Sequence, residues 1–349
     1  MYRCGLPGPG GAQYCPFYQP GCHASSLEVE SLAAVAAARG GFYSTHMKSE
    51  GDYILQSLDE VISLARKTGI RAEVSHLKTA GEKNWSKIDE VLAKVDRAVD
   101  EGLLMGADRY PFCAAGTDLD IVLPDWAQIG AAPAELKRLC DPILLKRIVE
   151  EINASSRDWS KVMIGGVWSS ENKGYSGRLI SELTDDPGEF VCKVLVNDGC
   201  KTGGFFFGMC EENLAKILSR PWTLPGSDAS LRSPCGVLGE DHPHPRAYAT
   251  MPEFYRRLRE LGFKREAAIA RMTSLPANRF ELKGRGVLKR GAYADIAVIR
   301  ESDFKTNSTY SSPHEFTQGV NLVMVNGVVT YRDGRFTGMR GGRFIGRDR

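Results

Sequence analysis

The feature that most constrains the fold is an alternation of helix-like and strand-like segments between residues 26 and 113. The run from Ser26 to Gly41 has a serine cap, apolar residues at helical spacing and a glycine end, so it predicts a helix. The β-rich run GFYSTHM follows, and then a second helical run that ends at Gly69. The unit repeats as RAEVSHLK and SKIDEVLAKVDRAVDEG, and LLMGADRYPF predicts a third strand. Connections of only a few residues predict a parallel sheet, in a barrel or in a doubly wound fold.

The chain divides further by composition. Residues 1–24 are rich in Gly, Pro and Cys and are expected to form an irregular lead-in, before the β/α units of residues 25–113. A less regular stretch, residues 114–200, is expected to be an inserted subdomain, and residues 201–280 are expected to carry the last β/α units. Residues 281–349 contain β-branched runs separated by Asn-Gly and Asp-Gly turns, which predict a small antiparallel β unit.

Composition excludes several classes of partner. The chain has 349 residues, with 45 Lys and Arg against 43 Asp and Glu, and no long basic run, which disfavours nucleic acid. Its apolar stretches are shorter than the roughly 18 residues of a membrane-spanning helix, and it begins with no signal peptide. Nine cysteines without a CxxC pair suit a reducing compartment. We therefore expect a soluble cytoplasmic protein.

Three residues are expected to share one site. His46 and His76 each lie at the carboxyl end of a predicted strand, and Asp228 has the same position in TLPGSDAS. The carboxyl ends of parallel strands meet on one face of a barrel, so the three side chains would line one cavity mouth. Two imidazoles and a carboxylate suit Zn²⁺, which activates water for hydrolysis. For a single histidine, the alternative is a hydrogen bond within the core.

An ordered set of short motifs carries a family resemblance. The segments STHMKSEG, EVSHLK, ADRYPF, GSDA, HPR, MTSLPANRF and GRGVLKRGAYADIAV resemble those of the N-acyl-D-amino-acid deacylases of the amidohydrolase superfamily. The resemblance runs from about Tyr18 to the C-terminus. It implies an α/β fold: a partial (β/α)8 TIM-type barrel with an insertion and a small C-terminal β unit. It also implies a zinc cofactor of one or two ions.

The resemblance assigns roles to individual residues. It implies that His46 and His76 are zinc ligands, and that Asp228 is the catalytic acid/base and contacts a second metal. It implies three substrate-binding residues: Lys78, Tyr110 and Arg246. Of these, Arg246 is expected to hold the α-carboxylate of the substrate, because a guanidinium matches a carboxylate in a bidentate pair.

Other residues near these motifs have open roles. Glu50 is expected to be an exposed carboxylate that leads into the next helix, with support of the site as the alternative. His242 and His244 lie in a Pro-rich loop, which we expect to form a lid over the cavity mouth rather than a metal-binding pair.

The sequence departs from the family at its start. Family members begin with a small β unit and a first barrel strand bearing a His-x-His or His-x-Asp pair, followed later by a cysteine ligand. No such pair precedes His46, and Cys4, Cys15 and Cys22 are not expected to replace that cysteine. We therefore expect an N-terminally truncated barrel with part of the zinc ligand set absent. Its exposed barrel edge would favour self-association.

The sequence thus predicts a metal-dependent hydrolase that cleaves N-acyl-D-amino acids to a carboxylate and a D-amino acid. In that reaction Asp228 would take the water proton and pass it to the departing amine. Two alternatives remain. One is a catalytically inactive scaffold or interaction subunit, and the other is a cyclic-amide hydrolase related to hydantoinase or dihydroorotase.

Overall fold

A parallel sheet lies at the centre of the molecule. The computed structural model describes residues 11–14, 21 and 24–345. The sheet has the order β1-β2-β3-β4-β8, and every neighbouring pair is parallel. Its strands are β1 (Gly11–Tyr14), β2 (Phe42–Thr45), β3 (Arg71–Val74), β4 (Met105–Arg109) and β8 (Thr223–Pro225). The predicted α/β alternation is therefore confirmed, with three helices between the first four strands: α1 (Ser26–Ala38), α2 (Ile54–Thr68) and α3 (Ile88–Asp100).

The first strand was not predicted. The sequence GAQY gives no apolar alternation, yet residues 11–14 pair with β2 over four residues. The expectation of an irregular segment is wrong there, because pairing with a neighbouring strand outweighs weak local propensity. The rest of residues 1–23, apart from Gly21, lies outside the described residues, and so do Cys4, Cys15 and Cys22.

Local signals set the ends of the helices. The Ser25 side chain accepts a hydrogen bond from the Glu28 amide and caps α1. Gly69 takes a left-handed conformation with φ of 67° and ends α2, as its position predicts. The apolar faces of α2 and α3 pack on alternate residues of the strands and form the largest buried cluster of the molecule.

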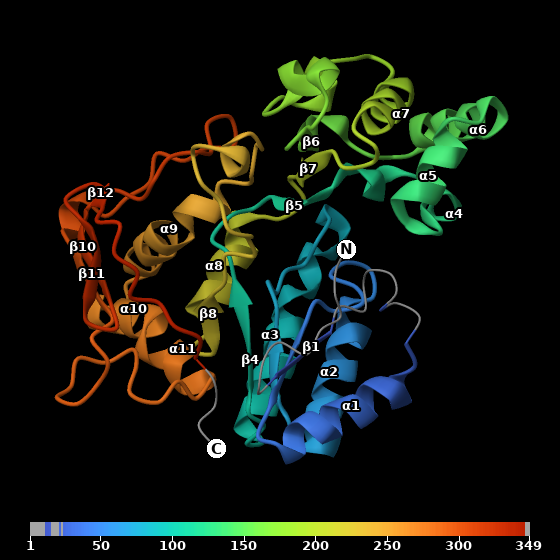
Figure 1. Cartoon of the computed structure of the whole chain (residues 1–349). Coiled ribbons are helices and arrows are strands. Elements are labelled where there is room, and N and C mark those ends of the chain that lie inside the picture. The colour runs from blue at the N-terminus through green and yellow to red at the C-terminus, as the bar shows by residue number, and fades with distance from the viewer. Residues whose placement is uncertain (1–10, 15–20, 22–23, 346–349) are drawn as a thin grey trace.

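A second unit is inserted between β4 and β8. It contains a three-stranded antiparallel sheet of order β5-β7-β6, with bounds β5 (Ala115–Asp118), β6 (Val162–Ile164) and β7 (Gly203–Phe206). Its helices are α4 (Asp125–Gln128), α5 (Ala131–Leu139), α6 (Pro142–Ala154) and α7 (Pro187–Asn197). These elements enclose a separate apolar core, and Figure 1 shows the unit standing above the carboxyl ends of the parallel strands.

Four helices follow the insertion: α8 (Glu211–Ser219), α9 (Arg246–Glu260), α10 (Arg265–Met272) and α11 (Ser274–Arg279). Arg279 of α11 forms an ion pair with Glu73 of β3 at 2.5 Å, across the backbone of Gly106. A Cβ at Gly106 would lie 2.0 Å from the Arg279 guanidinium, so a larger residue at this position on β4 would displace the arginine side chain. Burial raises the pKa of Glu73 to about 7. These contacts place the Arg279 side chain on the sheet face opposite to α2 and α3.

The C-terminal β unit forms as expected. A four-stranded antiparallel sheet has the order β12-β11-β10-β9, with bounds β9 (Ile296–Ile299), β10 (Val320–Val325), β11 (Val328–Arg332) and β12 (Arg335–Phe336). Its two hairpin turns are Asn326-Gly327 and Asp333-Gly334, and all four residues have positive φ. In Figure 1 this sheet lies on the outer side of α9 and α10.

Short 3₁₀ segments connect the other elements: Glu82–Lys87, Leu119–Val122, Trp159–Lys161, Ser170–Tyr175, Ile180–Glu182, Val237–Gly239 and Glu301–Asp303. Among the residues that the structure describes, no helix combines the length and apolar character needed to cross a lipid bilayer.

Candidate metal centre and its cavity

A cavity of about 1160 Å³ lies between the carboxyl ends of the parallel strands and the inserted unit. Its wall includes all six residues that the sequence singled out: His46, His76, Lys78, Tyr110, Asp228 and Arg246. Strand ends supply most of them, because β2, β3, β4 and β8 run parallel and finish at the same edge. The expected gathering of strand-end side chains around one mouth is therefore what the structure has.

Backbone geometry aims two of these side chains. His46 directly follows β2, whereas His76 is the second residue after β3 and Asp228 the third after β8. Both His76 and Asp228 have left-handed backbone conformations, with φ of 41° and 47°. Such conformations cost a non-glycine residue about 1 kcal/mol or more, and they are typically found where function demands them.

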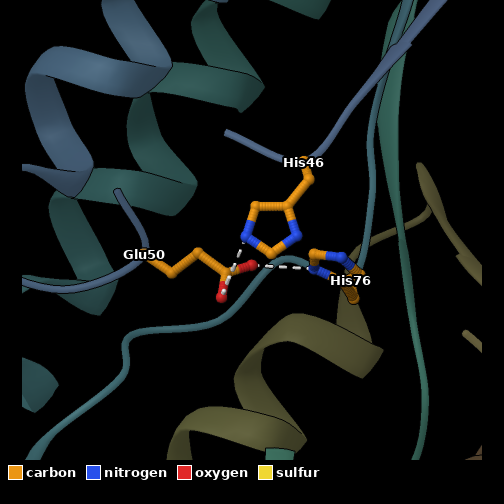
Figure 2. A group of neighbouring side chains, drawn as sticks. All are labelled: His46, Glu50 and His76. Atoms are coloured by element: carbon orange, nitrogen blue, oxygen red, sulfur yellow. Dashed lines mark ion pairs between the residues drawn. The ribbon is translucent and has the colours of Figure 1, made fainter. Parts of the chain in front are cut away.

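Three donor side chains converge in this cavity. Among the described residues, one group of three, His46, Glu50 and His76, has ligand atoms that all lie within 4.8 Å of one another. The Glu50 carboxylate lies beside both rings, 3.8 Å from His46 Nε2 and 2.7 Å from His76 Nδ1. Figure 2 shows the carboxylate facing both imidazoles. The ring centroids are 4.5 Å apart in an edge-to-face arrangement.

This result corrects the expectation for Glu50. Its side chain is only 12% exposed and does not lead a helix into solvent, because α2 begins four residues later at Ile54. Sequence reasoning missed Glu50 as a donor, since residues 46 to 53 form an irregular loop in which spacing does not fix side-chain direction.

Lys78 contacts two of the three donor side chains, Glu50 and His76. The Lys78 ammonium is 2.8 Å from His76 Nδ1, and it donates hydrogen bonds to the Glu50 carboxylate and to the His76 carbonyl. Lys78 is buried, and inward-facing acceptors hold its side-chain nitrogen. The same acceptors suit a metal cation, because two imidazoles and one glutamate form a zinc ligand set with a fourth position open for catalysis.

Burial and charge set the protonation of the donors. Burial lowers the pKa of His46 to about 4, so its imidazole is neutral at pH 7 and has a lone pair to offer. Burial alone would raise the pKa of Glu50, but the charges of Lys78 and His76 outweigh it and hold that pKa well below its usual range. Glu50 is therefore an anionic donor across the physiological pH range.

Asp228 lies apart from the three donors. Its carboxylate accepts the guanidinium of Arg246 at 2.8 Å, while another nitrogen of Arg246 donates to the Gly116 carbonyl at 3.2 Å. The Asp228 charge still acts on His46, whose pKa it raises against the larger effect of burial. In this structure Asp228 and Arg246 thus hold each other at the cavity wall.

Tyr110 forms the floor beneath this pair. The side chain is fully buried, and its hydroxyl has no hydrogen-bond partner among the described residues. The guanidinium carbons of Arg109 and Arg246 lie 4.1 and 4.6 Å from its ring centroid. A buried hydroxyl that lacks a partner is costly unless a ligand or water completes it.

The two loop histidines have separate contacts. His244 is buried, its Nε2 lies 2.9 Å from the Ala114 carbonyl, and its ring packs against Phe205 at 5.3 Å. His242 Nε2 lies 2.7 Å from the Tyr310 carbonyl. Both histidines line the cavity, and neither belongs to the group of three donors. Whether their loop moves as a lid stays a prediction.

Comparison with known proteins identifies relatives that are similar in sequence to this chain. It is 30% identical over 336 residues to the N-acyl-D-glutamate deacylase of Alcaligenes xylosoxydans xylosoxydans, a match that covers 95% of this chain and 59% of the relative. It is 28% identical over 337 residues to the D-aminoacylase of the same organism, covering 95% and 60%. The chain is therefore similar in sequence to N-acyl-D-amino-acid deacylases. No family model matches it.

Solved structures of these deacylases agree in fold. A D-aminoacylase crystal structure superposes with a TM-score of 0.74 at 28% identity, covering 95% of this chain and 61% of that one. The N-acyl-D-glutamate deacylase of Bordetella bronchiseptica gives 0.70 at 28% identity, covering 92% and 59%. It is a complex with zinc and a phosphonate that mimics the tetrahedral intermediate. Another D-aminoacylase structure is described with a binuclear metal centre.

The chain spans about three fifths of the length of these deacylases. A D-hydantoinase structure, at 12% identity and a TM-score of 0.50, shares the fold alone.

Proposed function

We propose that this chain takes part in zinc-dependent hydrolysis of N-acyl-D-amino acids, releasing a carboxylate and a D-amino acid. The observation that carries the proposal is the convergence of His46, Glu50 and His76 in a cavity whose wall also holds Asp228. Two relatives at 28 to 30% identity act on N-acyl-D-amino acids, as their names state.

The donor set supports zinc as the cofactor. His46, His76 and Glu50 would hold the ion, in agreement with the preference of Zn²⁺ for nitrogen and carboxylate ligands and with the neutral state of His46. Bound there, zinc supplies Lewis-acid chemistry that activates water and polarises the amide carbonyl. A second ion beside Asp228 remains part of the proposal, suggested by the binuclear centre of a D-aminoacylase.

The chain's own side chains then have defined tasks. Asp228 accepts the proton of the attacking water on its carboxylate and returns it to the departing nitrogen. Arg246 holds the α-carboxylate of the substrate with its planar guanidinium. Lys78 and the unpaired hydroxyl of Tyr110 complete the binding of the substrate's polar atoms.

The proposal includes the finer fold. We infer that the five parallel strands are a part of a (β/α)8 barrel, with the Arg279 side chain reaching Glu73 on its inner face. Support comes from the TM-score of 0.74 with a D-aminoacylase. A crystal structure with closed or open strand edges would decide the point.

Self-association and location also belong to the proposal. β1 and β8 end the described parallel sheet, and α1 exposes Leu27, Leu32 and Val35, so a second copy could cover this side. Analytical ultracentrifugation would reveal a dimer. A cytoplasmic location is supported by the free thiols of all six described cysteines.

The deciding experiment measures amine release. Purified protein is freed of metal, reconstituted with zinc and supplied with N-acetyl-D-glutamate, N-acetyl-D-leucine, their L-enantiomers and hydantoin. Zinc-dependent release from the D-substrates alone supports the deacylase. Ring opening of hydantoin would favour the cyclic-amide hydrolase, and zinc binding without turnover on any substrate would favour the inactive scaffold. Asp228→Asn serves as the catalytic control.

A further inference from the structure

Asp108 of β4 contacts the two turns that carry His76 and Asp228, but it does not line the cavity. β4 lies between β3 and β8 in the sheet, so its carboxyl end is next to both the turn that carries His76 and the turn that carries Asp228. The carboxylate of Asp108 accepts a hydrogen bond from the backbone N–H of His76 at 2.9 Å. The wall of the cavity does not include Asp108.

The same carboxylate packs against the second turn. A Cβ on Gly226 would lie 2.2 Å from Asp108 Oδ1 and 2.9 Å from Asp108 Cβ, distances that real Cβ atoms do not reach. Gly226 lies two residues before Asp228, and its amide donates to the Arg109 carbonyl at 3.3 Å. Glycine at this position therefore lets the β8 turn approach the carboxylate closely.

Both turns need such support because both are strained. His76 and Asp228 have φ of 41° and 47°, a region that costs a non-glycine residue about 1 to 3 kcal/mol unless its surroundings hold it. Two hydrogen bonds stabilise this conformation at His76. Its own amide donates to the Asp108 carboxylate, and the amide of Leu77 donates to the Asp108 carbonyl at 3.0 Å. One residue thus fixes the conformation that aims the His76 ring.

We propose that Asp108 is a positioning residue that sets the direction of the His76 imidazole and the approach of the Asp228 turn. It acts through the backbone of its neighbours and touches neither metal nor substrate. The expected effect on zinc affinity rests on the proposed function. The expected effect on the His76 amide does not depend on it.

Three variants and one control test this role. Asp108→Asn keeps an acceptor oxygen for the His76 amide, and Asp108→Ala removes it. Gly226→Ala leaves Asp108 in place but introduces the clash with its carboxylate. Asp59→Ala is the matched control, because Asp59 pairs with Lys94 on the surface, far from these turns in the sequence. Circular dichroism selects the variants that fold.

The first measurement is hydrogen exchange of the His76 amide in metal-free protein, followed by NMR. We expect Asp108→Ala to raise the exchange rate by about tenfold or more, corresponding to the loss of one hydrogen bond to a charged acceptor. Asp108→Asn should stay within about threefold of the wild type. Equal protection in wild type and Asp108→Ala would overturn the proposal.

The second measurement is the zinc dissociation constant. Removing a group that orients a metal ligand typically weakens binding by about 10 to 100-fold, which is the range expected for Asp108→Ala and Gly226→Ala, with Asp59→Ala unchanged. Gly226→Ala should cost less in the Asp108→Ala background, because the two shortest contacts of the new Cβ are then absent. Additive effects of the two changes would overturn the coupling between the turns.

The two measurements separate this inference from the proposed function. If the wild-type protein binds no zinc, the metal site fails, and exchange at the His76 amide in the Asp108 and Gly226 variants still decides the positioning role. If the wild type binds zinc and Asp108→Ala folds and binds it equally well, the metal site stands and the positioning role fails.

Discussion

Replacing Glu50 with glutamine tests the metal site most directly. The change keeps the size of the side chain and removes the negative charge that lies beside His46 and His76. Because the pKa of Glu50 is held well below its usual range, the wild-type side chain is a carboxylate at any pH used for the assay. The variant therefore differs by one charge throughout.

The expected loss can be worked from ligand linkage. Changes beside a metal ligand cost about 10 to 100-fold in affinity, so loss of a direct donor is expected to cost about 100-fold. At a free zinc concentration 100 times the wild-type dissociation constant, binding stabilises the wild type by about 2.7 kcal/mol and the variant by only about 0.4 kcal/mol. For a chain of 349 residues the unfolding entropy is about 0.7 kcal/mol/K, so the zinc-induced rise in Tm should fall by about 3 °C.

The assay combines competition for zinc with a chromophoric chelator and thermal unfolding with and without zinc. Glu60→Gln is the matched control, because Glu60 lies on α2, is half exposed and makes a surface ion pair with Lys48. The reasoning is refuted if Glu50→Gln binds zinc as tightly as Glu60→Gln while His46→Ala and His76→Ala do not. That pattern would leave two histidines as the ligands and make Glu50 a partner of Lys78 alone.

Three further outcomes are expected. Lys78→Met removes a positive charge that contacts both His76 and Glu50, so it should tighten zinc binding about tenfold in the chelator assay while slowing turnover. Arg246→Lys should raise KM for N-acyl-D-amino acids by about 10 to 100-fold with a smaller change in kcat, because an ammonium lacks the planar fork that binds a substrate carboxylate in a bidentate pair. Burial raises the pKa of Glu73 from its ordinary 4.5 to about 7, so the folded state binds this proton more tightly than the unfolded state does. The contribution of Glu73 to the free energy of unfolding is therefore fully present below pH 4.5 and is lost as the pH rises through 7. Chemical denaturation across that window should show a loss of stability that is roughly 3 kcal/mol larger in the wild type than in Glu73→Gln.

The sequence predicted those features of the fold that depend on strand periodicity, helix capping and turn residues. His46 and His76 were located at strand ends because short β-rich runs precede them, and Gly69 marked the end of α2 because a left-handed residue must close that helix. The hairpins of the C-terminal sheet followed from Asn326-Gly327 and its Asp-Gly counterpart. Each of these signals is local, so it does not depend on the rest of the fold.

What the sequence could not predict depends on contacts between distant segments. Glu50 turns inward because Lys78, 28 residues later, meets its carboxylate in the cavity. Asp228 forms its ion pair with an arginine 18 positions further along, at the first residue of α9. Strand β1 forms because its backbone pairs with β2, although its own sequence shows no strand periodicity. Neither periodicity nor motif spacing contains such information.

The arrangement of charges in the cavity leads to one more testable consequence. Two of its carboxylates are already paired with cations: Glu50 with Lys78, and Asp228 with Arg246. A metal bound by Glu50 competes with Lys78, and a substrate carboxylate bound by Arg246 competes with Asp228. Metal binding would therefore release an ammonium for the substrate, and substrate binding would release Asp228 to accept a proton.

This exchange of partners predicts positive coupling between the two ligands, which thermodynamic linkage makes reciprocal. Zinc should tighten the binding of a non-hydrolysable phosphonate analogue of an N-acyl-D-amino acid by about tenfold or more, measured by calorimetry. Direct contact between the analogue and zinc would persist in Lys78→Met, whereas the part contributed by the released ammonium would not. The coupling should accordingly be smaller in Lys78→Met than in the wild type. Equal coupling in the two proteins would show that Lys78 stays with Glu50 when the metal binds, and the proposed exchange of partners would then be wrong.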